Sequence, residues 1–112
     1  MRKWIAVVVL GLACAPAWAT CPPEGQTRES LEALKALQWT LPDAAARQAL
    51  AEGLVDCLGD PDPALRDGLA YEGLAHWMRA KQLEPDGLRV LRDKLYAALK
   101  DCLLYTSDAA DD

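Results

Sequence analysis

Apolar residues recur at the spacing of α-helices through most of the chain, and polar residues that favour helix starts precede the apolar runs. Thr27 predicts the start of a first helix, which runs through Trp39 and ends near Thr40. Asp43 predicts the N-cap of a second helix, which Gly59 ends. We expect the inner face of the second helix to consist of residues at helical spacing, namely Ala46, Leu50, Leu54, Cys57 and Leu58.

The stretch from Asp60 to Met78 predicts the helix around which the others are arranged. The carboxylate of Asp62 can cap its first turn, and Pro63 suits the first helical position because its missing N–H would be unpaired there. Up to about Lys81, the apolar residues cover half of the helical wheel, which indicates contact with more than one neighbour. This half contains Leu65, Leu69, Ala70, Gly73, Leu74, Trp77 and Ala80.

Arg66 lies within the same half of the wheel, where an unpaired guanidinium would be costly to bury. It therefore needs an acidic partner, and the nearest candidates are Asp62, Asp67 and Asp60. We interpret Arg66 as one member of a structural ion pair that ties the helix start to its loop, in preference to a ligand-binding arginine.

A fourth helix is expected to begin at Glu84 and Pro85, with one apolar stripe made of Leu88, Leu91, Leu95, Ala98 and Leu99. Short links between the predicted helices make consecutive helices antiparallel. The helix starts near Arg28 and Pro63 are about 35 residues apart, and those near Ala44 and Pro85 about 41, as in stacked helical hairpins. The predicted fold class is all-α, with two antiparallel hairpins of an α-solenoid. A closed four-helix bundle is the alternative, because it shows the same periodicity.

The run LAEGLVDCL followed by GDPDPALRDGLAYEGL resembles a HEAT-type repeat, in which two antiparallel helices meet at an Asp-Pro turn followed by a Leu/Val-Arg pair. Over residues 21–101, the chain more closely resembles the N-terminal part of a bacterial family known as domain of unknown function 2785. The residues that carry this resemblance are Asp60, Pro61, Asp62, Pro63, Leu65, Arg66, Asp67, Tyr71 and Trp77. The resemblance implies a HEAT-like repeat and no specific activity. Members of the family are longer, with His-containing segments in a second half, so an active site there is not carried over to this chain.

Residues 1–19 have the pattern of a secretory signal peptide. It consists of a positive start, an apolar stretch and a small-x-small cleavage site, carried by Arg2 and Lys3, by Trp4 to about Ala13, and by Ala17-Trp18-Ala19. The apolar stretch is well short of the roughly 20 residues that a membrane anchor needs. Lipidation at Cys14 is disfavoured because no leucine stands three positions before it. We therefore expect an exported protein, periplasmic or secreted, with no membrane association after cleavage.

The segment CLLYTSDAADD, residues 102–112, resembles one reading frame of the transposase end sequence and adapter used to prepare fragmented DNA libraries. We interpret it as an adapter-derived tail and exclude it from fold reasoning, so that the helical domain covers residues 20–101 and is truncated. On this interpretation, a following natural helix is expected to cover the stripe of the fourth helix.

Cys21 and Cys57 are the cysteines that remain once the signal peptide and the tail are set aside. A disulfide between them is the economical interpretation for an oxidising compartment, where it would contribute roughly 3–4 kcal/mol in the chain-entropy model. The alternatives are a free core thiol at Cys57 and a catalytic cysteine, although no neighbouring residue supplies a base.

His76, the only histidine, follows Glu72 by one turn, so two potential metal ligands share a helix face. Zinc sites need three or four ligands, so we expect no metal and interpret His76 as a half-buried packing residue. The acidic cluster of Asp56, Asp60 and Asp62 lacks the spacing and turn glycine of a calcium loop. We assign these carboxylates to caps and turns.

Candidate chemistry is sparse: residues 20–101 contain no phosphate loop, dinucleotide fingerprint or nucleophile motif. We therefore predict no catalytic residue and no cofactor, and enzyme status is uncertain. The net charge of −5, without a basic stripe, argues against a nucleic-acid partner. The expected function is an exported binding or scaffold module for a protein or peptide. The alternative is the scaffold half of an enzyme or ligand-binding protein whose site residues lie outside this chain.

Overall fold

The computed structural model describes residues 20–110, and every regular element in that range is helical. The elements are α1 (Arg28–Ala36), α2 (Ala44–Cys57), α3 (Pro63–Leu65), η2 (Arg66–Tyr71), α4 (Glu72–Arg79) and α5 (Pro85–Ala110). The all-α fold class is confirmed. The predicted signal peptide lies outside the described residues, as do the last two residues of the predicted tail.

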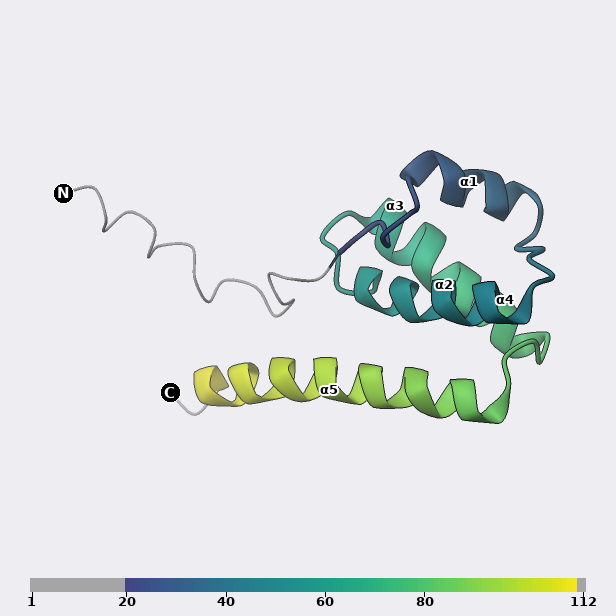
Figure 1. Cartoon of the computed structure of the whole chain (residues 1–112). Helices are drawn as coiled ribbons and strands as arrows, with labels where there is room; N and C mark the ends of the chain where they lie inside the picture. Colours follow the sequence, from purple (N-terminus) through teal and green to yellow (C-terminus); the bar gives the residue numbers. More distant parts are fainter. Residues whose placement is uncertain (1–19, 111–112) are drawn as a thin grey trace.

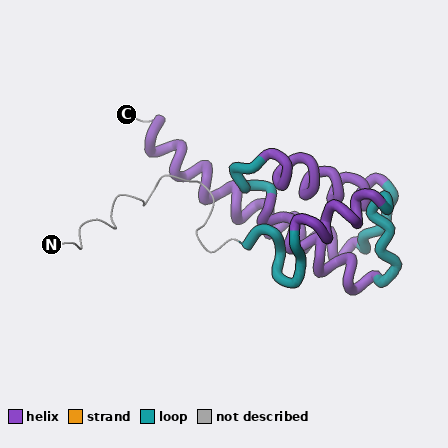
Figure 2. Tube along the Cα trace, turned by 90° about the horizontal axis from the view of Figure 1, so that it is seen from above, coloured by secondary structure: helices purple, strands orange, loops and turns teal. Residues whose placement is uncertain are grey.

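Successive helices run in alternating directions (Figure 1). The segments α3, η2 and α4 follow one another without a break and form one central helix, which lies with α2 between α1 and α5. The last helix runs alongside α2, and its second half extends beyond the other helices (Figures 1 and 2). Within residues 20–110, no helix combines the length and the apolar character needed to cross a bilayer.

The predicted helix caps are confirmed. The hydroxyl of Thr27 accepts a hydrogen bond from the N–H of Ser30 at 2.9 Å, and the hydroxyl of Ser30 accepts one from the N–H of Thr27. The Asp43 carboxylate accepts from the N–H of Ala45 at 2.9 Å. Each cap satisfies donors that a helix start would otherwise leave unpaired.

The central helix contains a π-helical turn, η2, where the sequence predicted a regular α-helix from Pro63 to about Lys81. A π-turn accommodates one extra residue, which rotates the residues before it by about 100° relative to those after it. This rotation gathers the buried residues into a narrower stripe, made of Leu65, Leu69, Ala70, Gly73, Leu74 and Trp77. It also moves Arg66 from the centre of the predicted apolar face to its edge.

The first helix ends at Ala36, so the prediction that it runs through Trp39 is wrong. Gln38 and Trp39 adopt left-handed backbone conformations, with φ of 57° and 60°. This turn directs the Trp39 ring into the core, where it meets the ring of Trp77 edge-on with centroids 6.0 Å apart. The indole N–H of Trp77 donates to the carbonyl oxygen of Trp39 at 2.9 Å. The free energy gained by burying the Trp39 ring against Trp77 is thus larger than the free energy lost by ending α1 at Ala36.

The inner face of α2 supplies much of the core. Leu50, Leu54 and Cys57 are buried as predicted, and Leu58 is half-buried. Ala51 and Val55 are also buried, because α2 contacts both the central helix and α5. The predicted burial of Ala46, and of Ala80 on the central helix, is wrong. Both lie at helix ends and are exposed to solvent.

The start of α5 packs against α2 through a few contacts. Leu91 is buried, and the ammonium group of Lys94 donates to the carbonyl oxygen of Glu52 at 2.7 Å and lies 3.4 Å from the Asp56 carboxylate. Leu88, Ala98 and Leu99 of the predicted stripe are exposed, and Leu95 is half-buried. The apolar stripe of α5 is therefore only partly covered by the described residues.

Candidate functional site

The two cysteines singled out in the sequence are joined. Their sulfur atoms lie 2.05 Å apart, and the bond links the segment before α1 to the end of α2. Pro23 is buried close to Gly53 of α2, so the segment before α1 packs against the helix to which it is bonded. The predicted Cys21–Cys57 disulfide is confirmed.

The predicted acidic cluster separates into individual structural roles. The Asp60 carboxylate accepts a hydrogen bond from the N–H of Asp62 at 2.8 Å, which shapes the turn. Asp62 caps Pro63–Leu65 through the N–H of Ala64 and forms a 3.1 Å ion pair with Arg28.

Arg66 is paired with Asp67, one of its three predicted partners, through two hydrogen bonds of 3.0 Å. The guanidinium side chain is 39% exposed, so the burial that the helical wheel indicated is wrong. The hydrogen bonds from Arg66 hold the pKa of the Asp67 carboxyl below its usual range. The same bonds, with the attraction of the Asp67 charge, raise the pKa of the guanidinium. This pair is a surface feature beside the helix start.

His76 and Glu72 form no metal site with their neighbours. The Glu72 carboxylate lies 2.9 Å from the ammonium group of Lys35, which also donates to the carbonyl oxygen of Gly68. His76 is half-buried. Among the residues that the structure describes, no group of three or more His, Cys, Asp or Glu side chains could hold a metal ion.

Tyr71 and Trp77, two residues on which the family prediction rests, lie on different sides of the central helix. Trp77 is fully buried against Trp39. Tyr71, the last residue of the π-turn, is 58% exposed and faces an apolar groove. The resemblance residues are thus divided between the core, the turn and an open surface.

This apolar groove runs between α4 and α5, and we call it the α4–α5 groove. It consists of two adjoining hollows of about 400 and 390 Å³, which share Met78 and Leu95. The central helix and the end of α2 contribute Leu58, Tyr71, Leu74, Ala75, Met78 and Arg79. The last helix contributes Leu88, Leu91, Arg92, Leu95, Tyr96 and Leu99.

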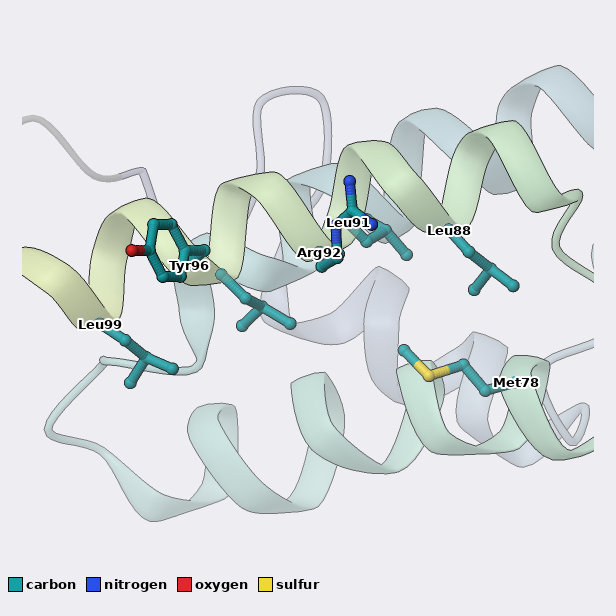
Figure 3. A pocket seen from close by; sticks show the side chains of 7 residues that line it. Met78, Leu88, Leu91, Arg92, Tyr96 and Leu99 are labelled. Atoms are coloured by element: carbon teal, nitrogen blue, oxygen red, sulfur yellow. The ribbon is translucent and has the colours of Figure 1, made fainter.

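Figure 3 shows how the two walls face each other. Leu88 and Leu99 point from α5 toward the central helix, and the thioether of Met78 points back toward α5. Single exposed apolar residues are ordinary, but a contiguous apolar patch on a small domain commonly marks an interaction site. The groove is such a patch, because leucine, methionine and tyrosine side chains make up most of its lining.

Sequence reasoning identified the α5 wall but missed the other wall. Tyr71, Leu74, Ala75 and Met78 stand at positions i, i+3, i+4 and i+7, a second apolar stripe on the central helix. Only Leu74 was assigned to the apolar half of the wheel. The spacing alone could have revealed this second face.

In comparisons with known proteins, no family model, curated protein or solved structure matches the chain.

The groove has the chemistry of a binding surface. Its lining offers leucine, methionine and tyrosine side chains, with no carboxylate, thiol or imidazole among the described residues that form it. Apolar side chains that enter it would leave water, at roughly 25 cal/mol for each Å² of apolar area buried. The groove can therefore retain an apolar ligand surface, with Arg79 and Arg92 at its edges.

Proposed function

We propose that the protein is an exported helical-repeat module that binds a protein or peptide partner, and that the α4–α5 groove receives an amphipathic helix of that partner. The observation that carries this proposal is the pair of apolar stripes that face each other across the groove. A helix that inserts side chains at i, i+3, i+4 and i+7 matches an elongated groove of this kind.

The repeat-like organisation supports the same function. HEAT-type repeats combine antiparallel helices with an Asp-Pro turn and an arginine that follows it. Here the turn and the arginine lie between Asp60 and Arg66, and they join α2 to the central helix. Stacked helical hairpins commonly bind other proteins along their exposed helices. We include in the proposal that the chain is a HEAT-like α-solenoid segment related to domain of unknown function 2785.

Export to the periplasm or the cell exterior is the cellular setting of this proposal. It is supported by the signal-peptide pattern of residues 1–19 and by the Cys21–Cys57 disulfide, because such bonds persist mainly in oxidising compartments.

The groove is tested with a labelled synthetic helix that carries leucines at i, i+3, i+4 and i+7, whose binding is followed by fluorescence anisotropy. Leu99→Ser should weaken binding about five- to tenfold, because a leucine of the groove wall no longer buries apolar area.

Leu37→Ser is the matched control, since Leu37 is 63% exposed and Leu99 is 57% exposed, but Leu37 lines neither hollow of the groove. The affinity of Leu37→Ser for the labelled helix should equal that of the unaltered protein. Equal losses in both variants would mean that the helix binds by unspecific apolar contact, and the proposal would fail.

A further inference from the structure

Arg79 stands where the α4–α5 groove meets a second, more polar hollow. It lines the groove beside Met78, and it also lines a neighbouring hollow of about 350 Å³ together with Lys35, His76 and three further residues. Arg79 lies in the last turn of α4 and is exposed. Its guanidinium can therefore reach a ligand in the groove without leaving water completely.

The arginines of the central helix and of α5 differ in how their charge is compensated. Arg66, Arg89 and Arg92 each form an ion pair with a neighbouring aspartate. Lys35 and Glu72 both line the polar hollow, and they are paired with each other at 2.9 Å. Arg79 forms no ion pair with any side chain of residues 20–100.

The local charge of the groove is opposite to that of the whole chain. The net charge of the protein is −5. Among the described residues that line the groove, however, the only charged side chains are Arg79 and Arg92. Because the guanidinium of Arg92 already donates to Asp93, the available positive charge is concentrated at Arg79.

We propose that the α4–α5 groove selects an acidic amphipathic helix, in which a carboxylate beside the apolar face pairs with Arg79. This inference rests on the proposed function, since it assigns the chemistry of the partner to the same groove. Leucine-type side chains of the partner fill the groove, while its carboxylate receives hydrogen bonds from the Arg79 guanidinium, which has no other acidic partner within residues 20–100. Charge complementarity of this kind determines which partner binds more than how tightly it binds.

The test compares two synthetic helices with the same leucine face, one flanked by glutamates and the other by lysines, titrated against the full chain at low ionic strength. The glutamate helix should bind about two- to fivefold more tightly, the difference expected for one surface ion pair. The overall negative charge of the protein favours the lysine helix, so a preference for glutamate reports the local field at Arg79.

Arg79→Glu should reverse the preference, and Arg28→Glu is its control. The control makes the same charge change at the start of α1, at a residue that lines neither hollow of the groove. It should leave the preference for glutamate intact. Raised salt should reduce that preference in the unaltered protein.

Three outcomes would contradict the inference. Equal binding of both helices, with no change in Arg79→Glu, would overturn the acidic partner and leave the groove as a helix site. Binding of neither helix would overturn the proposed function as well. A concentration-dependent dimer in sedimentation velocity, abolished by Leu99→Ser, would assign the groove to a second copy of the chain instead.

Discussion

Gly73 is a residue at which one added carbon atom would disturb the packing of the two core tryptophans. A Cβ at this position would lie 2.9 to 3.1 Å from three atoms of the Trp39 ring. That ring is buried and packed against Trp77, so it has little room to move. We expect Gly73→Ala to lower the free energy of unfolding by about 1–2 kcal/mol, because overpacking outweighs the gain in helix propensity.

Gly68→Ala is the matched control on the same helix. A Cβ there approaches only the ammonium group of Lys35, at 4.0 Å. The helix propensity of alanine should then raise the free energy of unfolding by up to about 1 kcal/mol. Urea denaturation distinguishes the two variants, and a stabilised Gly73→Ala protein would show that the Trp39 ring is not fixed against this helix.

Arg66 is the residue whose predicted role changes most. If Arg66 formed a buried ion pair, Arg66→Ala would lower the free energy of unfolding strongly. Because its pair with Asp67 is exposed, we expect only a small decrease, close to that of Lys81→Ala at an exposed lysine. Because the pKa of Asp67 is lowered in the folded protein, the contribution of the pair is fully present above the usual aspartate pKa and is lost as pH falls through the lowered pKa of the folded state.

The denaturation midpoints of Arg66→Ala and the unaltered protein should therefore differ slightly at neutral pH and converge once the pH falls below the lowered pKa of Asp67. A large difference that persists in acid would indicate that Arg66 is held by other contacts.

At the scale of elements, helix starts were predictable and one helix end was not. Thr27, Asp43 and Asp62 each cap a helix with a side-chain oxygen, a signal that depends on neighbouring residues alone. The end of α1 carries no glycine, and its left-handed turn at Gln38 and Trp39 exists because Trp39 can reach the core. Such a turn depends on contacts with residues far away in the sequence.

The π-turn was equally hidden from the sequence. A wheel drawn with ideal α-helical geometry already placed Leu65, Leu69 and Trp77 in one half, so nothing indicated an extra residue. The π-turn η2 becomes favourable only when the central helix packs against α1 and α2, because the narrower stripe of buried residues then faces both helices. The position of Arg66 followed from that local change, which is why its burial was predicted wrongly.

The disulfide is the element-scale feature with the largest predicted effect on stability. The bond closes a sequence separation of 36 residues. Its reduction should lower the free energy of unfolding by roughly 2–4 kcal/mol, because the unfolded chain gains conformational freedom. Urea denaturation of residues 20–112 with Cys102→Ser, with and without reductant, measures this difference.

In residues 20–112 with Cys102→Ser, the further substitution Cys21→Ser should give the denaturation midpoint of the reduced protein. Added reductant should not change the midpoint of this variant. A denaturation midpoint that is unchanged by reduction would show that the bond is absent or that the segment before α1 contributes no stability.

At the scale of the whole molecule, the sequence predicted an all-α chain with an incompletely covered last helix, and both features are present. It did not predict where the uncovered stripe of α5 would lie, because that depends on how α5 docks on α2. Leu91 and Lys94 direct α5 onto α2 and leave its other apolar residues facing Tyr71 and Met78. The groove therefore forms only when α5 packs against α2, although each of its two apolar stripes can be recognised in the sequence.

The central claim is that the α4–α5 groove receives an apolar helix, and the methyl group of Met78 reports on it directly. The chain has two methionines, Met1 and Met78, so methyl-labelled methionine gives two NMR signals, which a Met78→Leu variant assigns. On titration with the leucine helix, we expect the Met78 signal to shift progressively to saturation while the Met1 signal stays in place. An unchanged Met78 signal at helix concentrations that saturate the anisotropy change would contradict the account, because the helix would then bind elsewhere.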